Sequence, residues 1–244
     1  MSEPVRVAMW SGPRNISTAM MRAWENRGDT TVWDEPLYAF YLHRTGIDHP
    51  GAAEVIAAGD TDWRRVVAAL TGPIPDGKSI YFLKLMTHHM LDEVDRGWLA
   101  QARNCFLIRD PREVIASYAR TRPEVTVSDV GVLQQVAIFE HAREVSGETP
   151  LVLDSRDVLE NPRAMLTALC AELEIPFSER MLTWPAGGRS SDGIWARYWY
   201  DAVNASTGFS PYVSKAHTLP ARLEPLAEEC EPHYRNLYEQ RLRP

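Results

Sequence analysis

The sequence predicts an α/β fold in three layers, with about five parallel strands in one sheet and helices on both of its faces. Short apolar runs recur along the 244 residues, and helical patterns separate them. Strands that alternate with helices in this way form a parallel sheet, because each connection crosses back over the sheet. The length suits one large core and no linker divides the chain, so we expect residues 1–244 to form a single domain.

Each expected element follows from apolar runs, periodicity or turn signals. The first strand runs from Val5 to the turn at Gly12, and the other four cover residues 30–36, 79–84, 104–109 and 149–154. Helices are expected at residues 17–26, 54–58, 62–70, 92–102, 110–118, 128–146, 155–160, 163–173, 195–205 and 221–242. The predicted helix caps are Thr61, Asp110 and Ser128, and a break at Asn161-Pro162 separates two of the helices. The aromatic-rich residues 37–43 receive no assignment.

Composition limits the classes of function. The net charge of −7 argues against nucleic acid and anionic membranes as partners, because both attract basic surfaces. The three cysteines, Cys105, Cys170 and Cys230, lack metal-ligand spacing and indicate a reducing compartment. Cys105 and Cys170 lie in apolar or helical patterns typical of core residues. The sequence has neither a secretory signal nor an apolar run long enough to span a membrane. We expect a cytoplasmic protein with no bound metal and a small-molecule partner, with homodimer formation left open.

The segment after the first strand has the features of an anion-binding loop. A tight turn at Gly12-Pro13 leads to a helix that starts at Ser17 or Thr18. Free backbone N–H groups and the positive end of the helix dipole favour a phosphate or sulfate there, and Arg14 adds a cation. The alternative is a purely structural helix start. The loop is not a Walker A motif, which requires a second glycine and a lysine before the hydroxyl residue.

Charged side chains also follow the next three strands. In a parallel sheet, ligands bind beyond the carboxyl ends of the strands, so these side chains are expected to converge. Arginine, lysine and histidine at that edge favour a ligand with more than one negative charge. The residues in question are Asp34, Glu35, Lys84, His88, His89, Arg109, Arg112 and Ser117.

Two stretches resemble the signatures of sulfotransferases that use 3′-phosphoadenosine 5′-phosphosulfate (PAPS) as the donor. These are residues 11–18, Ser-Gly-Pro-Arg-Asn-Ile-Ser-Thr, and residues 106–118, which contain Arg-Asp-Pro followed by a serine. The resemblance implies a sheet like that of the P-loop nucleoside kinases. It also implies that Arg109 and Ser117 bind the 3′-phosphate of the donor.

By the same resemblance, the first stretch is the loop that binds the 5′-phosphosulfate. Arg14, Ser17 and Thr18 match the basic and hydroxyl positions of that loop, and Gly12, Pro13 and Asn15 are expected to bind the donor with them. Asn15 and Ile16 depart from the family pattern, and glycine is usual at the place of Ile16. A late loop with Arg189 and Gly193 matches the basic loop that covers the donor in the family. The aromatic residues of 195–200 either line an acceptor pocket or belong to the core.

Sulfuryl transfer requires positioning, charge neutralisation and a general base. Arg14 is expected to hold the sulfuryl oxygens, with Lys84 as a second charge. The base is Glu35 or His88, with His89 as a further candidate; Glu35 could instead form a salt bridge that orients Arg14. We therefore expect sulfuryl transfer from PAPS to a hydroxyl or amine of a small-molecule acceptor. The alternatives are a P-loop-type small-molecule kinase and a nucleotide-binding module without transfer activity.

Overall fold

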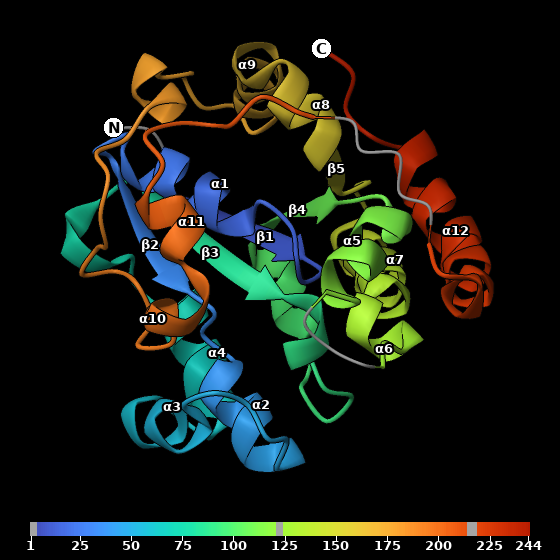
Figure 1. The fold of residues 1–244 in the computed structure, drawn as a ribbon. Helices are drawn as coiled ribbons and strands as arrows, with labels where there is room; N and C mark the ends of the chain where they lie inside the picture. Colours follow the sequence, from blue (N-terminus) through green and yellow to red (C-terminus); the bar gives the residue numbers. More distant parts are fainter. Residues whose placement is uncertain (1–3, 121–123, 214–218) are drawn as a thin grey trace.

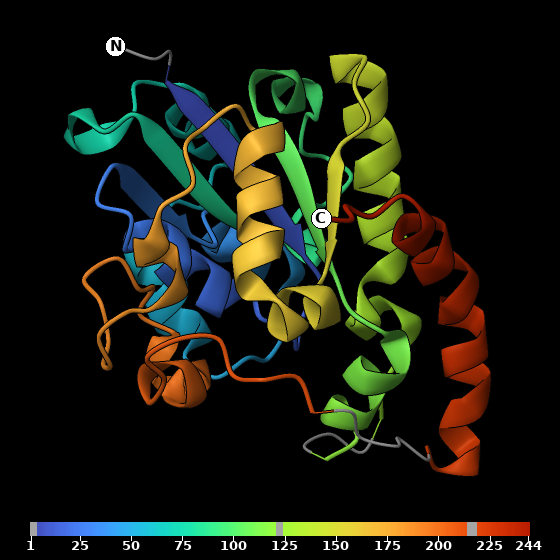
Figure 2. The same ribbon diagram turned by 90° about the horizontal axis from the view of Figure 1, so that it is seen from above.

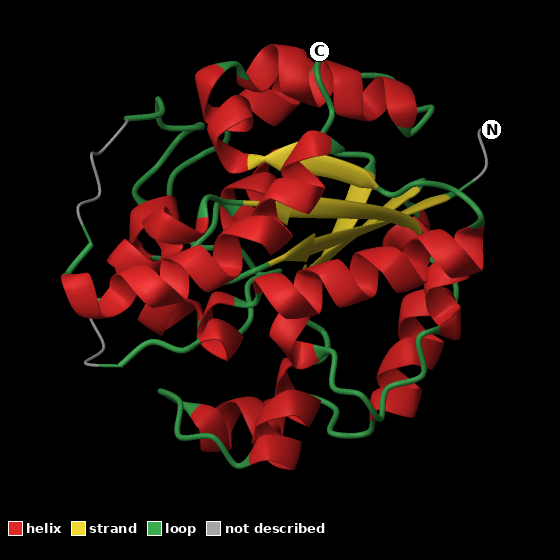
Figure 3. Cartoon of the chain, turned by 90° about the vertical axis from the view of Figure 1, so that its right-hand side faces the viewer, coloured by secondary structure: helices red, strands yellow, loops and turns green. Residues whose placement is uncertain are grey.

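The computed structural model describes residues 4–120, 124–213 and 219–244. Its centre is a five-stranded sheet in the order β2-β3-β1-β4-β5, and every neighbouring pair of strands is parallel. Figure 1 shows these strands side by side, and Figure 3 shows the helices that surround them. The strands are β1 (Val5–Ser11), β2 (Thr30–Asp34), β3 (Ile80–Met86), β4 (Arg103–Ile108) and β5 (Leu151–Asp154). The predicted α/β class and parallel sheet are confirmed.

Helices cover both faces of the sheet, as the alternation of side chains along β1 requires. Val7 and Met9 belong to a core cluster with α1 and α9, whereas Ala8 and Trp10 belong to a second cluster with α4, α7 and α12. Figure 2 shows α8 and α9 on one side of the sheet and α7 and α12 on the other. The helices are α1 (Ser17–Glu25), α2 (Tyr38–Thr45), α3 (Ala52–Ala58), α4 (Trp63–Thr71), α5 (Pro111–Tyr118), α6 (Val127–Val130), α7 (Val132–Ser146), α8 (Ser155–Glu160), α9 (Pro162–Glu172), α10 (Ala196–Trp199), α11 (Asp201–Asn204) and α12 (Glu224–Glu239).

Of the three predicted helix caps, only Asp110 caps its helix. The Asp110 carboxylate accepts a hydrogen bond from the Arg112 amide at 2.8 Å, with Pro111 as the first helical residue of α5. Asn161 caps α9 in the same way, so the predicted break at Asn161-Pro162 is confirmed. At α4 the predicted cap Thr61 is wrong, because the neighbouring Asp62 accepts from the Arg64 amide at 2.9 Å.

The long helix predicted at residues 128–146 is interrupted, and Ser128 does not cap it. Thr126 forms a capping box with Asp129, and the short helix α6 ends at Gly131, where φ is +78°. A β-carbon at Gly131 would lie 3.3 Å from the Pro13 ring and 3.3 Å from the Thr87 hydroxyl. Glycine therefore serves two purposes here: it adopts the left-handed conformation and lets the chain approach the loop after β1.

Three further segments differ from the prediction. Residues 37–43, left unassigned, form most of α2, which begins at Tyr38. The helix predicted at 92–102 is a 3-10 helix over Gly97–Gln101 only, and residues 195–205 form the two short helices α10 and α11. The C-terminal helix α12 has the predicted position, after a 3-10 turn at Ala221–Leu223.

Cys105 and Cys170 have the expected core role, and Cys230 is buried as well. Cys105, Cys170 and Cys230 are all buried and unpaired, and burial raises the pKa of each thiol. Within the three described ranges, no helix is both long enough and apolar enough to cross a bilayer. The same ranges contain no group of three or more histidine, cysteine or acidic residues arranged to hold a metal ion.

Candidate active site

The two predicted anion-binding motifs meet at the carboxyl ends of β1 and β4. The Arg14 Nε donates to the Ser117 hydroxyl at 3.0 Å, and the Arg109 guanidinium donates to the backbone carbonyl of Arg14 at 2.5 Å. Arg14 has a φ of +56°, an unusual conformation for a residue with a β-carbon. The structure thus brings Arg14 into contact with Arg109 and Ser117, which lie 95 and 103 residues further along the chain. All three were predicted to bind the donor.

Asn15 fixes the base of this loop. Its side-chain nitrogen donates to the Leu107 carbonyl at 2.9 Å, and its side-chain oxygen accepts from the Ile16 amide at 2.8 Å. Ile16 has a φ of −90°, which any residue adopts, and its side chain packs against the core. The backbone therefore does not require glycine at position 16, because the residue with a positive φ in this loop is Arg14. The helix α1 begins at Ser17, and neither Ser17 nor Thr18 caps it.

Two residues that the sequence reasoning missed hold Arg109. The Glu113 carboxylate accepts from Nε and Nη2 of Arg109 at 2.9 and 2.8 Å. Tyr212 donates to the other Glu113 oxygen at 2.7 Å. Arg109 precedes the cap residue Asp110, so its pairing with Glu113 depends on the turn between β4 and α5 rather than on the spacing of residues within a helix. Arg112 instead forms an ion pair with Glu224 of α12 at 2.9 Å.

A second cluster lies at the carboxyl ends of β2 and β3. The Lys84 ammonium donates to Asp34 at 2.9 Å, to the Tyr200 hydroxyl at 2.8 Å and to Glu35. A lysine has three N–H donors, so these three partners use all of them. Burial disfavours the ammonium, but the carboxylates of Asp34 and Glu35 hold the pKa of Lys84 well above its usual value. A contact of Lys84 with a donor molecule, as predicted, requires one of these bonds to open.

Glu35 is the carboxylate of this cluster with the properties of a base. Burial raises its pKa and the Asp34 charge adds to the rise, while the Lys84 charge opposes it. Its backbone φ is +44°, and its amide donates to the Lys84 carbonyl at 2.9 Å. The ion pair of Glu35 is with Lys84, so the alternative in which Glu35 orients Arg14 through a salt bridge is wrong.

The two histidines occupy different environments. His89 is 2% exposed and stacks between Tyr38 and Tyr41, with ring centroids 4.7 and 4.8 Å away. Its Nδ1 lies 3.9 Å from the Glu35 carboxylate and has no hydrogen-bond partner. Burial lowers the pKa of His89 well below its usual value, so the ring is neutral. His88 is partly exposed and meets the Tyr41 ring edge-on at 5.3 Å.

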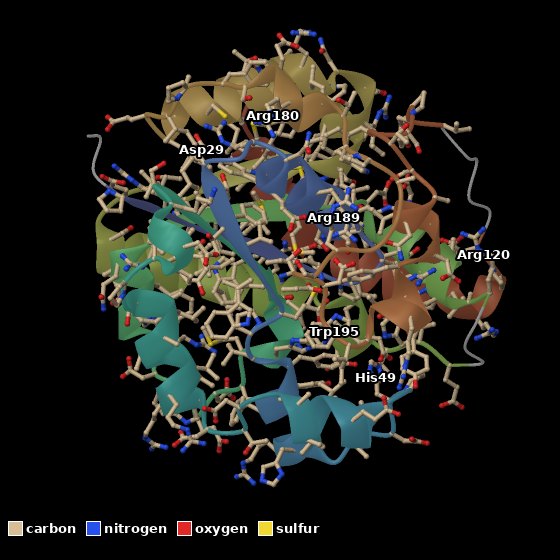
Figure 4. All side chains as sticks on the ribbon, turned by 90° about the vertical axis from the view of Figure 1, so that its left-hand side faces the viewer. Asp29, His49, Arg120, Arg180, Arg189 and Trp195 are labelled. Atoms are coloured by element: carbon tan, nitrogen blue, oxygen red, sulfur yellow. The ribbon has the colours of Figure 1, made fainter. Side chains whose placement is uncertain are left out.

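Arg189 is held within its own loop and beside the end of α1, where its Nε lies 3.7 Å from the Glu25 carboxylate. Its guanidinium donates to the carbonyls of Pro185, Gly187 and Gly188 in its own loop. Figure 4 shows it well separated from Arg120, which lies just beyond the end of α5. Among the aromatic residues of 195–200, Trp195 and Tyr200 are buried, whereas Tyr198 and Trp199 are 39% and 44% exposed. The predicted role of Arg189 on the donor stays a prediction.

Comparison with known proteins agrees with the two motifs. The family model described as "Sulfotransferase domain" matches residues 5–235, nearly the whole chain, and the chain therefore belongs to this family.

Solved sulfotransferases share the fold at low sequence identity. The sulfotransferase domain of the Synechococcus PCC 7002 olefin synthase has a TM-score of 0.52 at 16% identity, over 94% of this chain and 95% of that chain. A sulfotransferase from Alicyclobacillus acidocaldarius has a TM-score of 0.53 at 11% identity, over 99% and 98%. A mouse sulfotransferase complexed with PAP has a TM-score of 0.52 at 11% identity, over 98% and 89%.

Two longer proteins of Arabidopsis thaliana are similar in sequence. "Branched-chain-amino-acid aminotransferase-like protein 2" is 34% identical over 227 residues, which cover 92% of this chain and 40% of that protein. "Branched-chain-amino-acid aminotransferase-like protein 1" is 33% identical over 235 residues, which cover 96% and 42%. The chain thus spans about two fifths of the length of these relatives.

Proposed function

We propose that this chain transfers the sulfuryl group of PAPS to a hydroxyl or amine of a small-molecule acceptor. The observation that carries the proposal is the junction of Arg14 with Arg109 and Ser117, which places two anion-binding motifs side by side. PAPS carries two separate anionic groups, a 3′-phosphate and a 5′-phosphosulfate, and the two motifs match them. PAP is adenosine 3′,5′-bisphosphate, which has a phosphate at both of the positions that are anionic in PAPS. The mouse relative is complexed with PAP, which supports the assignment.

The donor is held by residues from two elements. Arg109 and Ser117 bind the 3′-phosphate, with Arg109 oriented by Glu113. The P-loop-like segment Gly12–Thr18 binds the 5′-phosphosulfate through Arg14, the hydroxyls of Ser17 and Thr18, and the free amides at the start of α1. Asn15 keeps this segment attached to β4. Lys84 and the late loop with Arg189 supply further positive charge if they reorient toward the donor.

Glu35 is the proposed general base. In the transfer step the acceptor oxygen or nitrogen forms a bond to sulfur while the bond from sulfur to the phosphate oxygen of the donor breaks, and the acceptor proton moves to the Glu35 carboxylate. A carboxylate with a raised pKa accepts this proton more readily than an ordinary surface glutamate. His88 and His89 are the competing candidates for the role of base, and the neutral His89 ring lies beside Glu35.

Ligand binding and transfer assays test the proposal in turn. Adenosine 3′,5′-bisphosphate is expected to raise the thermal midpoint by several degrees at a concentration of about 100 Kd, since binding then adds about 2.7 kcal/mol. ATP is the comparison ligand, and preference for ATP would support the kinase alternative. Incubation with ³⁵S-labelled PAPS and a metabolite extract is expected to label an acceptor. Binding of the bisphosphate without any labelled product would support the module that lacks transfer activity.

The proposal also covers the domain organisation, the metal requirement and the cellular compartment. Residues 1–244 form one sulfotransferase-like domain, and no metal takes part in the transfer. The three unpaired, buried cysteines support the cytoplasm as the compartment, because thiols persist in reducing surroundings. Homodimer formation stays open.

A further inference from the structure

Asp34, which the sequence placed only among the charged residues at the carboxyl edge of the sheet, connects three parts of the molecule. It is the last residue of β2 and is 3% exposed. One carboxylate oxygen accepts from Lys84 at 2.9 Å, and the other accepts from the Gly193 amide at 3.1 Å. The Tyr200 hydroxyl lies 2.9 and 2.7 Å from the two oxygens. Asp34 therefore ties residues 193–200 to the cluster that contains Glu35.

These contacts fix the direction of the Lys84 ammonium. With its three donors on Asp34, Tyr200 and Glu35, the ammonium has one geometry in which every N–H is satisfied. A buried charge is tolerated only when it is paired and hydrogen-bonded, so loss of the Asp34 charge would leave Glu35 as the one carboxylate that neutralises Lys84. Lys84 would then neutralise Glu35 more strongly, and a neutralised carboxylate is a weaker base.

We propose that Asp34 is a positioning residue for the transfer reaction, which holds Lys84 and Tyr200 so that the Glu35 carboxylate stays available to the acceptor. The inference rests on the proposed function, and it assigns Asp34 and Tyr200 to the site in addition to the residues predicted from the sequence. Asp34 acts through Lys84, whose Nζ it shares with Glu35.

The expected change in the Glu35 pKa depends on the charged and titratable groups that surround this residue. Asp34 adds negative charge and raises the pKa of Glu35, while Lys84 lowers it. Replacing Asp34 with asparagine removes the first effect and leaves the second, so the Glu35 pKa is expected to fall. The groups that face Glu35 are Asp34 from β2, Lys84 from β3, Tyr38 from α2, His89 from the 3-10 helix after β3, and Tyr200 from the turn between α10 and α11.

Asp192 offers a matched control within the same segment. Its carboxylate forms a two-point ion pair with Arg22 of α1, at 2.5 and 2.7 Å, and it also accepts from the Arg189 amide at 2.8 Å. Asp192→Asn therefore loosens the attachment of residues 192–200 without changing the charge beside Lys84. Asp34→Asn changes both. A comparison of the two variants separates the charge effect from the loss of attachment.

The decisive measurement is the titration of the Glu35 carboxyl carbon by NMR in protein with ¹³C-labelled glutamate. Glu35→Gln identifies the signal. The midpoint is expected to move to lower pH in Asp34→Asn and to stay in place in Asp192→Asn. An unchanged or higher midpoint in Asp34→Asn, or an equal shift in both variants, would overturn the proposal. This titration needs neither donor nor acceptor.

Turnover measurements distinguish this proposal from the proposed function. Tyr200→Phe keeps the charges of Asp34 and Glu35 and removes one hydrogen-bond acceptor of Lys84. This variant also tests the proposal if Asp34→Asn does not fold. Its kcat is expected to fall on the order of tenfold to a hundredfold, with an unchanged Kd for adenosine 3′,5′-bisphosphate. An unchanged kcat would count against Asp34 and Tyr200 alone. Failure of the wild-type protein to transfer any sulfuryl group would overturn the proposed function, whatever the titration of Glu35 shows.

Discussion

Ser117→Ala is expected to weaken the binding of adenosine 3′,5′-bisphosphate without weakening that of adenosine 5′-phosphate. Without ligand, the Ser117 hydroxyl accepts from Arg14 Nε at 3.0 Å, and Ser117 is 7% exposed. Arg14 itself is exposed, so water replaces the lost partner and the destabilisation is about 1 kcal/mol, or about 2–4 °C in the thermal midpoint. Adenosine 3′,5′-bisphosphate loses a direct donor to its 3′-phosphate. Its Kd is expected to rise about tenfold, equivalent to about 1.4 kcal/mol.

Adenosine 5′-phosphate is the matched ligand, because it lacks the 3′-phosphate. Because this ligand has no 3′-phosphate to accept from the Ser117 hydroxyl, its binding does not depend on that hydroxyl. Calorimetric titration is therefore expected to show an unchanged Kd for this ligand in Ser117→Ala. Ser146→Ala, which removes a helix-end hydroxyl of α7, is the control and should change neither Kd. An unchanged Kd ratio of the two ligands in Ser117→Ala would refute the assignment of Ser117 to the 3′-phosphate.

Three other predictions concern the base, the loop and pH. Glu35→Gln is expected to lower kcat by about 10²–10⁴-fold and His88→Ala much less, with bisphosphate binding retained; the opposite order would assign the base to His88. Gly131→Ala should destabilise the protein by about 1–3 kcal/mol in denaturant titrations, because φ is +78° and the β-carbon would crowd Pro13; unaltered stability would contradict this. Burial raises the pKa of Asp154 to about 6, so its contribution to stability is greatest below pH 4 and is lost as pH rises to 6. Relative to wild type, Asp154→Asn should gain about 2–3 kcal/mol between pH 4 and 7, and a constant difference would exclude this effect.

The sequence was sufficient to predict the parallel sheet and the start of α5. Five apolar runs predicted five strands, because each strand of a covered parallel sheet must be apolar on both faces. The Asp110-Pro111 start of α5 was readable because capping involves residues two positions apart. The placement of Lys84 on the strand beside β1 also followed from the pattern.

Helix interruptions and short helices were harder to predict. Gly131 looked like one weak position in a helical pattern, and its role depends on Pro13, which is far away in the chain. The helix α2 was missed because its aromatic residues have modest helix propensity, and packing against the core stabilises it instead. Local patterns contain no information about such distant neighbours.

The sequence by itself determined which residues follow the carboxyl ends of the strands, since the strands and their common direction are predicted from local patterns. Only the tertiary structure decided which of them are partners. Arg14 pairs with Ser117 rather than Glu35, and Lys84 is enclosed by Asp34, Glu35 and Tyr200. The Tyr200 hydroxyl contacts Asp34, which is 166 residues away in the chain, and Lys84, which is 116 residues away. Hydrogen bonds need partners within about 3 Å, and that proximity arises when loops and helices pack over the sheet.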